Sequence, residues 1–303
     1  MIALLLLHTA LATGVRFEEV PCPLGGAPAR RFHKVSANKL GGYDSDLASY
    51  STKGQFRTHA ISTCPDSLYS VYGEHIGRPV SEEERPAVEA ALATVRRGLE
   101  NPDDPPVWER YVLAAHVYQA LGRDPIDVAR VYLEASWTAR DAAVGVYVGG
   151  LDGPTAAKKI LTAGDAELAK PLTEANRKTV LYSLARVAHR AGENTRRDSY
   201  LQRFKALGPT APERQAMALF LLHAREVEPA MQNMAISLLR EGLERTDREP
   251  LQIAEATYLL ADLLRRRDQP EEALRHYKAV VAMGSVRPQI RDMAHFFVGE
   301  LDR

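Results

Sequence analysis

Hydrophobic and polar positions follow a helical period from residue 79 to the end of the chain. In "VSEEERPAVEAALATVRRGLE", Ser81 is followed three residues later by Glu84, which is a capping-box pattern. Val88, Leu92 and Val95 then recur at helical spacing. Gly, Pro or Asp interrupts the period at short intervals as far as the C-terminus. The pattern predicts a series of helices joined by tight turns over residues 79–303.

One repeat unit stands out within this region, at residues 254–287. The small residues Ala261 and Ala273 flank a turn at residues 268–270, and Tyr277 follows on the second helix. Small residues on both sides of a tight turn are typical of the tetratricopeptide repeat. Weaker copies occupy residues 107–140, 178–209 and 215–245. We therefore expect about three to five stacked helix pairs, closed by a terminal helix at residues 290–301.

The first part of the chain differs from the rest in composition and periodicity. Residues 15–78 are rich in Gly, Pro, Ser and Asp and lack helical periodicity, which predicts a small module of strands and loops.

Residues 1–14 form an apolar run with no charge before Arg16, too short to span a bilayer. Ala10 and Ala12 fit a signal-peptidase site, which predicts a leader removed near Thr13 and an exported, periplasmic or secreted protein. A cytoplasmic protein with a buried first element is the alternative.

Composition and charge argue against several classes of function. The 303 residues carry 39 basic and 39 acidic side chains, so the whole chain attracts neither nucleic acid nor an anionic membrane surface. No zinc-protease, hydrolase, phosphate-loop or dinucleotide motif is present in the sequence. We expect no enzyme activity, no cofactor and no stable membrane span.

The first helices of successive pairs in such an array line a concave groove. Aligning the two clearest copies places eight residues on that face: Tyr182, Arg186, His189, Arg190, Tyr258, Asp262, Arg265 and Arg266. Arginines beside aromatic rings suit an acidic or C-terminal carboxylate peptide. A solvated polar face without a partner is the alternative.

The two cysteines stand in similar motifs, Cys22-Pro23-Leu24-Gly25-Gly26 and Cys64-Pro65-Asp66-Ser67-Leu68-Tyr69, with Asp44-Ser45-Asp46-Leu47 between them. With the helices that follow, these stretches resemble the bacterial family called domain of unknown function 2225. Its members carry two Cys-Pro-x-Cys knuckles and end in tetratricopeptide-like helices. The resemblance implies a zinc-ribbon-derived module, but it implies no activity. Gly25 and Ser67 replace the second cysteine of each knuckle, so the family's four-thiolate metal site does not carry over.

Three states of Cys22 and Cys64 are open. Because the resemblance places the two knuckles side by side, we expect a disulfide between them without zinc, closing a loop worth about 4 kcal/mol. Alternatively, zinc is retained with His33 and His59 as the missing ligands. In the third state both cysteines are reduced. Asp44 and Asp46 have two interpretations, as turn caps that bond their own backbone or as ligands of a cation.

The sequence thus predicts a mainly α protein, with a tetratricopeptide-like solenoid after a small zinc-ribbon-derived module. The function that follows is a non-enzymatic interaction or scaffold protein of the bacterial envelope, with a partner protein or acidic peptide in the helical groove. The alternative is a metal-binding or redox-responsive module attached to the helical array.

Overall fold

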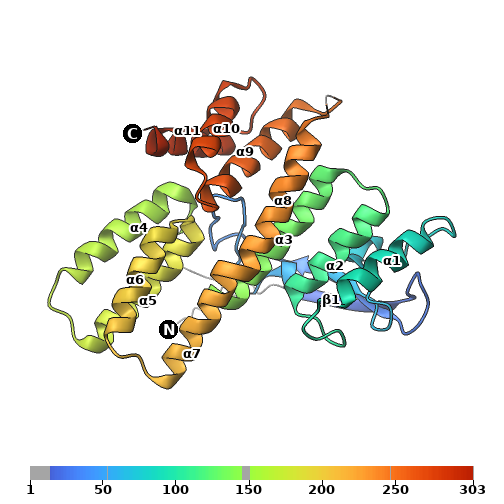
Figure 1. Ribbon diagram of the computed structural model, residues 1–303, viewed down its shortest axis with the longest axis horizontal. Helices are drawn as coiled ribbons and strands as arrows, with labels where there is room; N and C mark the ends of the chain where they lie inside the picture. The colour runs from blue at the N-terminus through green and yellow to red at the C-terminus, as the bar shows by residue number, and fades with distance from the viewer. Residues whose placement is uncertain (1–13, 53, 145–150, 246, 303) are drawn as a thin grey trace, which may run out of the picture.

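The computed structural model describes residues 14–52, 54–144, 151–245 and 247–302 of the chain, and these residues are mainly helical (Figure 1). A small strand-and-loop module comes first, and helices follow to the C-terminus. The predicted mainly helical class, with a small strand-containing module before the helices, is therefore confirmed, while the tetratricopeptide-like solenoid and the zinc-ribbon origin of the module stay predictions. The expected leader and its cleavage site near Thr13 fall outside the described residues.

Two short antiparallel hairpins form the N-terminal module. β1 (Gly14–Val20) pairs with β2 (Ala29–Ser36), and β3 (Ile61–Thr63) pairs with β4 (Ser70–Tyr72). Short 3₁₀ turns at Phe56–His59 and Gly73–His75 flank the second hairpin. Because an isolated two-stranded hairpin is marginally stable in water, the module needs other support. β4 packs on the second long helix of the chain, which provides part of it.

The helical part begins where the sequence predicts it. Ser81 and Glu84 form the expected reciprocal cap, with Glu84 N donating to Ser81 Oγ at 3.2 Å and Ser81 N to Glu84 Oε2 at 3.0 Å. The helices are α1 (Arg85–Arg96), α2 (Val107–Ala120), α3 (Pro125–Val144), α4 (Gly153–Leu168), α5 (Glu174–Ala191), α6 (Asn194–Ala206), α7 (Ala211–Leu222), α8 (Glu228–Leu243), α9 (Pro250–Arg266), α10 (Pro270–Ala282) and α11 (Pro288–Leu301).

The repeat unit predicted at residues 254–287 is an antiparallel helix pair, α9 and α10. Ala261, Ala273 and Tyr277 are completely buried between its helices, as the repeat pattern requires. The copies at residues 107–140 and 178–209 correspond to the pairs α2/α3 and α5/α6. That these pairs are tetratricopeptide repeats stays a prediction.

The copy predicted at residues 215–245 is wrong. α7 and α8 are joined by one π-helical turn, His223–Val227, into a continuous rod instead of a pair (Figure 1). No glycine interrupts this stretch before Gly242. Pro229 lacks an N–H, and the wider turn before it accommodates that loss, with Glu228 N donating to His223 O.

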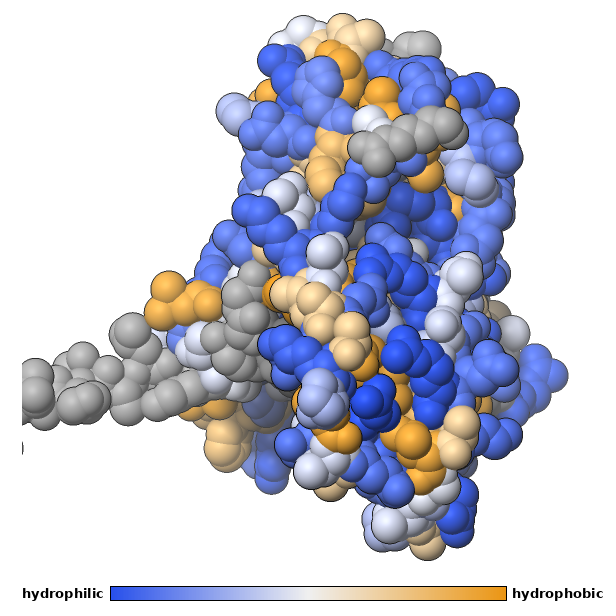
Figure 2. Space-filling model, turned by 90° about the vertical axis from the view of Figure 1, so that its left-hand side faces the viewer, coloured by the Kyte–Doolittle hydropathy of each residue, from blue (hydrophilic) through white to orange (hydrophobic). Residues whose placement is uncertain are grey.

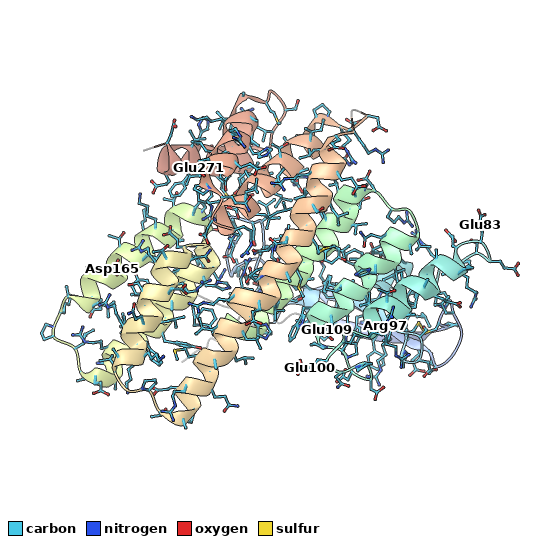
Figure 3. All side chains as sticks on the ribbon, in the orientation of Figure 1. Glu83, Arg97, Glu100, Glu109, Asp165 and Glu271 are labelled. Atoms are coloured by element: carbon cyan, nitrogen blue, oxygen red, sulfur yellow. A yellow bond between two sulfur atoms is a disulfide. The ribbon has the colours of Figure 1, made fainter. Side chains whose placement is uncertain are left out.

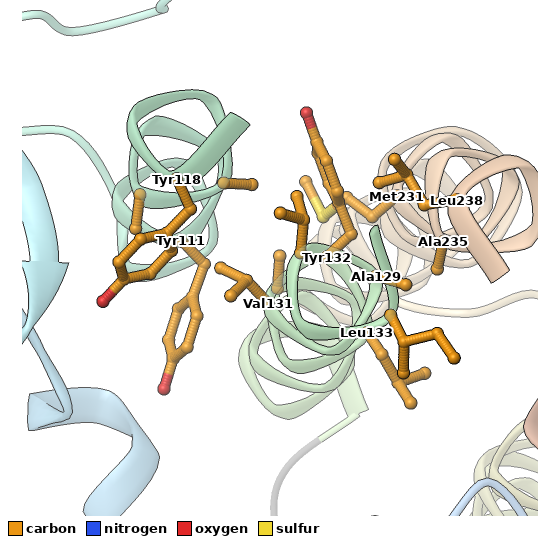
Figure 4. Packing of buried hydrophobic residues seen from close by; sticks show 14 of the residues in the cluster. Tyr111, Tyr118, Ala129, Val131, Tyr132, Leu133, Met231, Ala235 and Leu238 are labelled. Carbon is orange, nitrogen blue, oxygen red and sulfur yellow. The ribbon is translucent and has the colours of Figure 1, made fainter. Parts of the chain in front are cut away.

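The arrangement departs from a regular stack because α3 packs along α8, its neighbour in space but not in sequence. Ala129 on α3 faces Ala235 on α8, and these small side chains let the two helices approach closely (Figure 4). The helices between them form a separate lobe with its own core, which includes Leu161, Leu184 and Phe220. Helix α4 of this lobe contacts the last helix, α11, where Lys158 Nζ lies 2.9 Å from Glu300 Oε1.

Most charged side chains lie on the outside. Glu83, Glu100 and Glu271 project from the surface (Figure 3). The face formed by the α4–α7 lobe is mainly hydrophilic, with apolar residues in separate small patches (Figure 2). Among the described residues, no helix has both the length and the apolar character that a membrane crossing requires.

Candidate functional site

The two cysteines form a disulfide, as expected. Cys22 follows β1 and Cys64 follows β3, and their Cα atoms lie 5.9 Å apart with a sulfur–sulfur bond of 2.11 Å. Each cysteine still begins a tight turn: Gly25 N donates to Cys22 O, and Leu68 N donates to Cys64 O, both at 2.9 Å. The bridge therefore joins two knuckle-like turns.

This bond rules out the alternative metal site. Both thiolates that it required are consumed by the disulfide. His33 instead lies 3.0 Å from Glu18, and His59 packs against Phe32 with ring centroids 4.8 Å apart. In the part of the chain that the structure describes, no three His, Cys, Asp or Glu side chains are grouped to hold a metal ion.

The acidic segment at residues 43–50 leaves the module and enters the middle of the helical array. It is a tight loop in which Asp44 N donates to Ala48 O at 2.9 Å and Tyr50 N donates to Gly42 O at 2.9 Å. Asp44, Ser45 and Asp46 are all buried, and their side chains contact α3, α5 and α9. Asp46 caps its own turn as one interpretation expected, accepting from Ala48 N at 3.4 Å, but both acids also bind arginines from distant helices, which neither interpretation included.

Arg140 on α3 is the centre of this buried charge cluster. Its guanidinium donates to Asp44 at 2.9 Å, to Asp46 at 2.5 Å and to Glu228 of α8 at 2.5 Å. Arg190 on α5 lies 2.8 Å from the other oxygen of Asp44. All five side chains are at most 2% exposed, so every charge depends on its neighbours for compensation.

Helix α9 completes the cluster around Ser45. Asp262 accepts from Ser45 Oγ at 3.1 Å and pairs with Arg265 and Arg266 at 2.8 and 2.7 Å. Both arginines also donate to Ser45 Oγ, at 3.0 and 2.9 Å. Tyr258 donates to the backbone oxygen of Ser45 at 2.6 Å. The segment is thus bound through both its side chains and its backbone.

Ion pairs with arginines lower the pKa values of Glu228 and Asp46 in the cluster. Burial by itself would raise the pKa of Glu228, but Arg140 and His189 outweigh it and lower that pKa to about 2. The same balance, set by Arg140 and Arg266, holds the pKa of Asp46 far below its ordinary value. Burial lowers the pKa of His189, which lies 2.8 Å from Glu228. The cluster is a set of opposite charges paired inside the protein.

Most of the residues predicted to line a groove therefore already bind other groups of the same chain. Six of the eight are part of the cluster: His189, Arg190, Tyr258, Asp262, Arg265 and Arg266. Tyr182 lies apart and packs on Phe204 and Phe220, with Arg186 one helical turn further along α5. The arginines do bind an acidic segment, but it belongs to the chain itself. The expectation of an open groove at these residues is corrected, since Arg190 is only 1% exposed.

An open cleft lies beside the cluster, between the N-terminal module and α3. It encloses about 440 Å³. Its lining residues are Phe32, Lys34, Ala37, Asn38, Lys39, Ser49, Tyr50, Ser51, Gln55, Phe56, Arg57, Ala60, Tyr72, Gly73, Glu74, Glu134 and Trp137. Sequence analysis missed this site because its walls come from two separate segments, residues 32–74 and residues 134–137.

The chain was compared with known proteins. A family of uncharacterized proteins conserved in bacteria (DUF2225) matches residues 18–297, which takes in the module, the acidic segment and nearly all the helices. The chain belongs to this family. No curated protein and no solved structure matches it.

This family match spans both sides of the cleft, so the module and the array belong to one conserved unit. An ion pair joins them at the cleft wall. Arg57 makes a bidentate pair with Asp141 of α3 at 2.6 and 2.9 Å and stacks over Tyr50 at 4.6 Å. Tyr50 in turn donates to Asp44 at 2.7 Å. The buried cluster therefore fixes one wall of the cleft.

Several polar groups in the cleft have unused bonding capacity. Lys34 and Lys39 are exposed at its rim, and neither has an acidic partner among the described residues. The indole N–H of Trp137 is buried and donates to no acceptor in the described part of the chain. Burial raises the pKa of Glu134, although hydrogen bonds with Tyr72 and Tyr111 oppose the rise. Of these groups, only Lys34 and Lys39 are exposed to a ligand, because protein atoms cover the indole nitrogen and Glu134 is already hydrogen-bonded.

Proposed function

We propose that this protein is a non-enzymatic interaction protein of the bacterial envelope, and that its partner binds in the cleft between the module and α3. The observation that carries the proposal is the cleft itself. It is open and lined by aromatic side chains, and two lysines without acidic partners in the described residues stand at its rim. Concave sites between two parts of a chain are common places for ligands.

The most strongly shifted acids of the cluster have a structural role, and Glu134, the acid with a raised pKa in the cleft, is engaged by Tyr72 and Tyr111. Acids and bases with strongly shifted pKa values often mark catalytic sites when they line a cleft. Here the acids with the most strongly lowered pKa values, Asp46 and Glu228, lie inside the buried cluster, where arginines pair with them. The cluster thus serves to hold the cleft wall in place, which reduces the ordering cost of binding.

The disulfide supports a location outside the cytoplasm. Structural disulfides persist in oxidising compartments such as the bacterial periplasm and are rare in the reducing cytosol. The family is bacterial. Export also agrees with the leader expected at residues 1–14.

Site-specific crosslinking in a bacterium that makes the protein tests the proposal. A photo-crosslinking residue is placed at Lys39, on the rim of the cleft, and in a separate strain at Lys205, which is exposed on α6 of the other lobe. We expect a defined protein adduct from position 39 that is absent from position 205.

The captured protein is then purified and titrated against the full chain. Lys34→Glu together with Lys39→Glu should weaken its binding at least about tenfold, since two attractive charges become repulsive. The control, Lys159→Glu with Lys205→Glu, changes net charge equally at exposed lysines elsewhere. Equal adducts from both positions, or binding unaffected by the cleft variant, would contradict the proposal.

A further inference from the structure

We infer that the cleft recognises an aromatic group that carries a carboxylate. This inference rests on the proposed function, because it names the chemistry that the same cleft binds. Two sources share this chemistry, a free aromatic acid and the C-terminal aromatic residue of a partner protein.

The aromatic side chains that line the cleft indicate that the ligand carries an aromatic group. Phe32 and Phe56 from the module, Tyr50 and Tyr72 beside them, and Trp137 from α3 all line the cavity. Rings pack edge-to-face or offset on such surfaces, at a gain beyond that of the buried area alone. A volume of about 440 Å³ is larger than one ring with a short chain needs, so one such group fits inside.

The carboxylate is indicated by the rim. The Lys34 ammonium lies 5.5 Å from the centre of the Phe56 ring, so a positive charge stands beside the aromatic wall. Lys39 is a second cation on the same lining, and Glu74 is the exposed acid there. Arg57, by contrast, is committed to Asp141 and to the backbone oxygen of Ser49. The two lysines are therefore the groups available for an anion.

Two matched probes test this chemistry on the oxidised full-length protein. N-acetyl-L-phenylalanine carries the carboxylate, and N-acetyl-L-phenylalaninamide has the same ring without the charge. The chain has only two tryptophans, so Trp108→Phe leaves Trp137 as the single reporter of the cleft by fluorescence. Ligand-observed NMR on the unmodified protein gives an independent reading if that variant folds poorly.

We expect the acid to bind at least tenfold more tightly than the amide and to change Trp137 emission. Lys34→Gln with Lys39→Gln should remove most of this preference, and the control Lys159→Gln with Lys205→Gln should retain it. Equal binding of acid and amide, no binding of either, or a preference that survives the cleft variant would overturn the inference.

A pentapeptide ending in phenylalanine, with a free or amidated C-terminus, separates the two sources. Tighter binding of the free-acid peptide than of N-acetyl-L-phenylalanine indicates the end of a partner protein. Binding of the small acid alone indicates a free metabolite. Failure of both probes in the presence of the crosslinked adduct at position 39 would reject this ligand class and leave the proposed function standing.

Discussion

At the scale of single residues, the acidic segment depends on backbone positions that admit no side chain. Gly42 has φ +79°, and a Cβ there would overlap the backbone oxygen of Leu151. Gly41 is similarly close to Tyr50, since a Cβ would lie 2.8 Å from the Tyr50 backbone oxygen. Glycine is required here both for the left-handed conformation and for the close approach of two chain segments.

We expect Gly42→Ala to destabilise the protein more than Gly25→Ala does. Both residues have a left-handed φ, which costs alanine about 1–2 kcal/mol. Only Gly42 also meets backbone atoms, whereas the space around Gly25 is open within 4 Å. The contact should add about 1–3 kcal/mol, measured by urea unfolding. Equal losses for the two variants would show that the acidic segment can shift without cost.

At the scale of elements, the disulfide compensates for a module with little core. The two hairpins are short, and the bridge ties the turn after β1 to the turn after β3 across 42 residues. Asp66 strengthens this link, because its side chain accepts from Ala27 N at 2.7 Å. The module is thus held by covalent and polar bonds in addition to apolar side chains such as Ile61, Leu68 and Val71, which join the core formed with the first helices.

Replacing both cysteines, Cys22→Ala with Cys64→Ala, should lower the free energy of unfolding by about 4 kcal/mol or less, with the loop-entropy value as the upper end. Alanine avoids placing a hydroxyl at Cys64, which is completely buried. Hydrogen exchange should rise first in β1–β4 and least in α9 and α10. Reductant added to the unmodified protein should reproduce the effect, and a variant as stable as the oxidised protein would refute it.

At the scale of the whole molecule, the buried charge cluster joins the module to helices α3, α5, α8 and α9, which are distant from it in sequence. Asp46 and Arg140 are separated by 94 residues, and Asp44 and Arg190 by 146. Breaking such a pair by removing one partner is costly, because the other charge stays buried. The cleft, one wall of which is Tyr50, should therefore lose its shape when the cluster is disrupted.

The cluster also predicts how stability depends on pH. The folded-state pKa of Glu228 is about 2, below its ordinary value of 4.5. Its contribution is fully present above about pH 4.5 and is lost as pH falls toward 2, on the order of 3 kcal/mol. Asp46 and Asp262 shift in the same direction. Denaturation at a series of pH values should show this loss, with a shallower slope for Glu228→Gln; a flat profile over that range would contradict it.

Much of the fold could be predicted because it depends on neighbouring residues. Helical periodicity, the cap formed by Ser81 and Glu84, and the turn between Ala261 and Ala273 all act within a few positions along the chain. The error at residues 215–245 arose because the π-helical turn that joins α7 and α8 into one rod leaves no signal in the hydrophobic pattern. The disulfide was predicted from two similar motifs and a family resemblance.

What the sequence by itself determined was thus the mainly helical class, the order of the two parts and the two Cys-Pro turns. Only the tertiary structure decided that Arg190 and Arg266 face the chain's own Asp44 and Asp46 instead of solvent. In the sequence, a charged residue of a helix gives the same pattern whether the folded protein exposes it or buries it. Its location depends on compensating charges from other elements, and these come together only when the chain has folded.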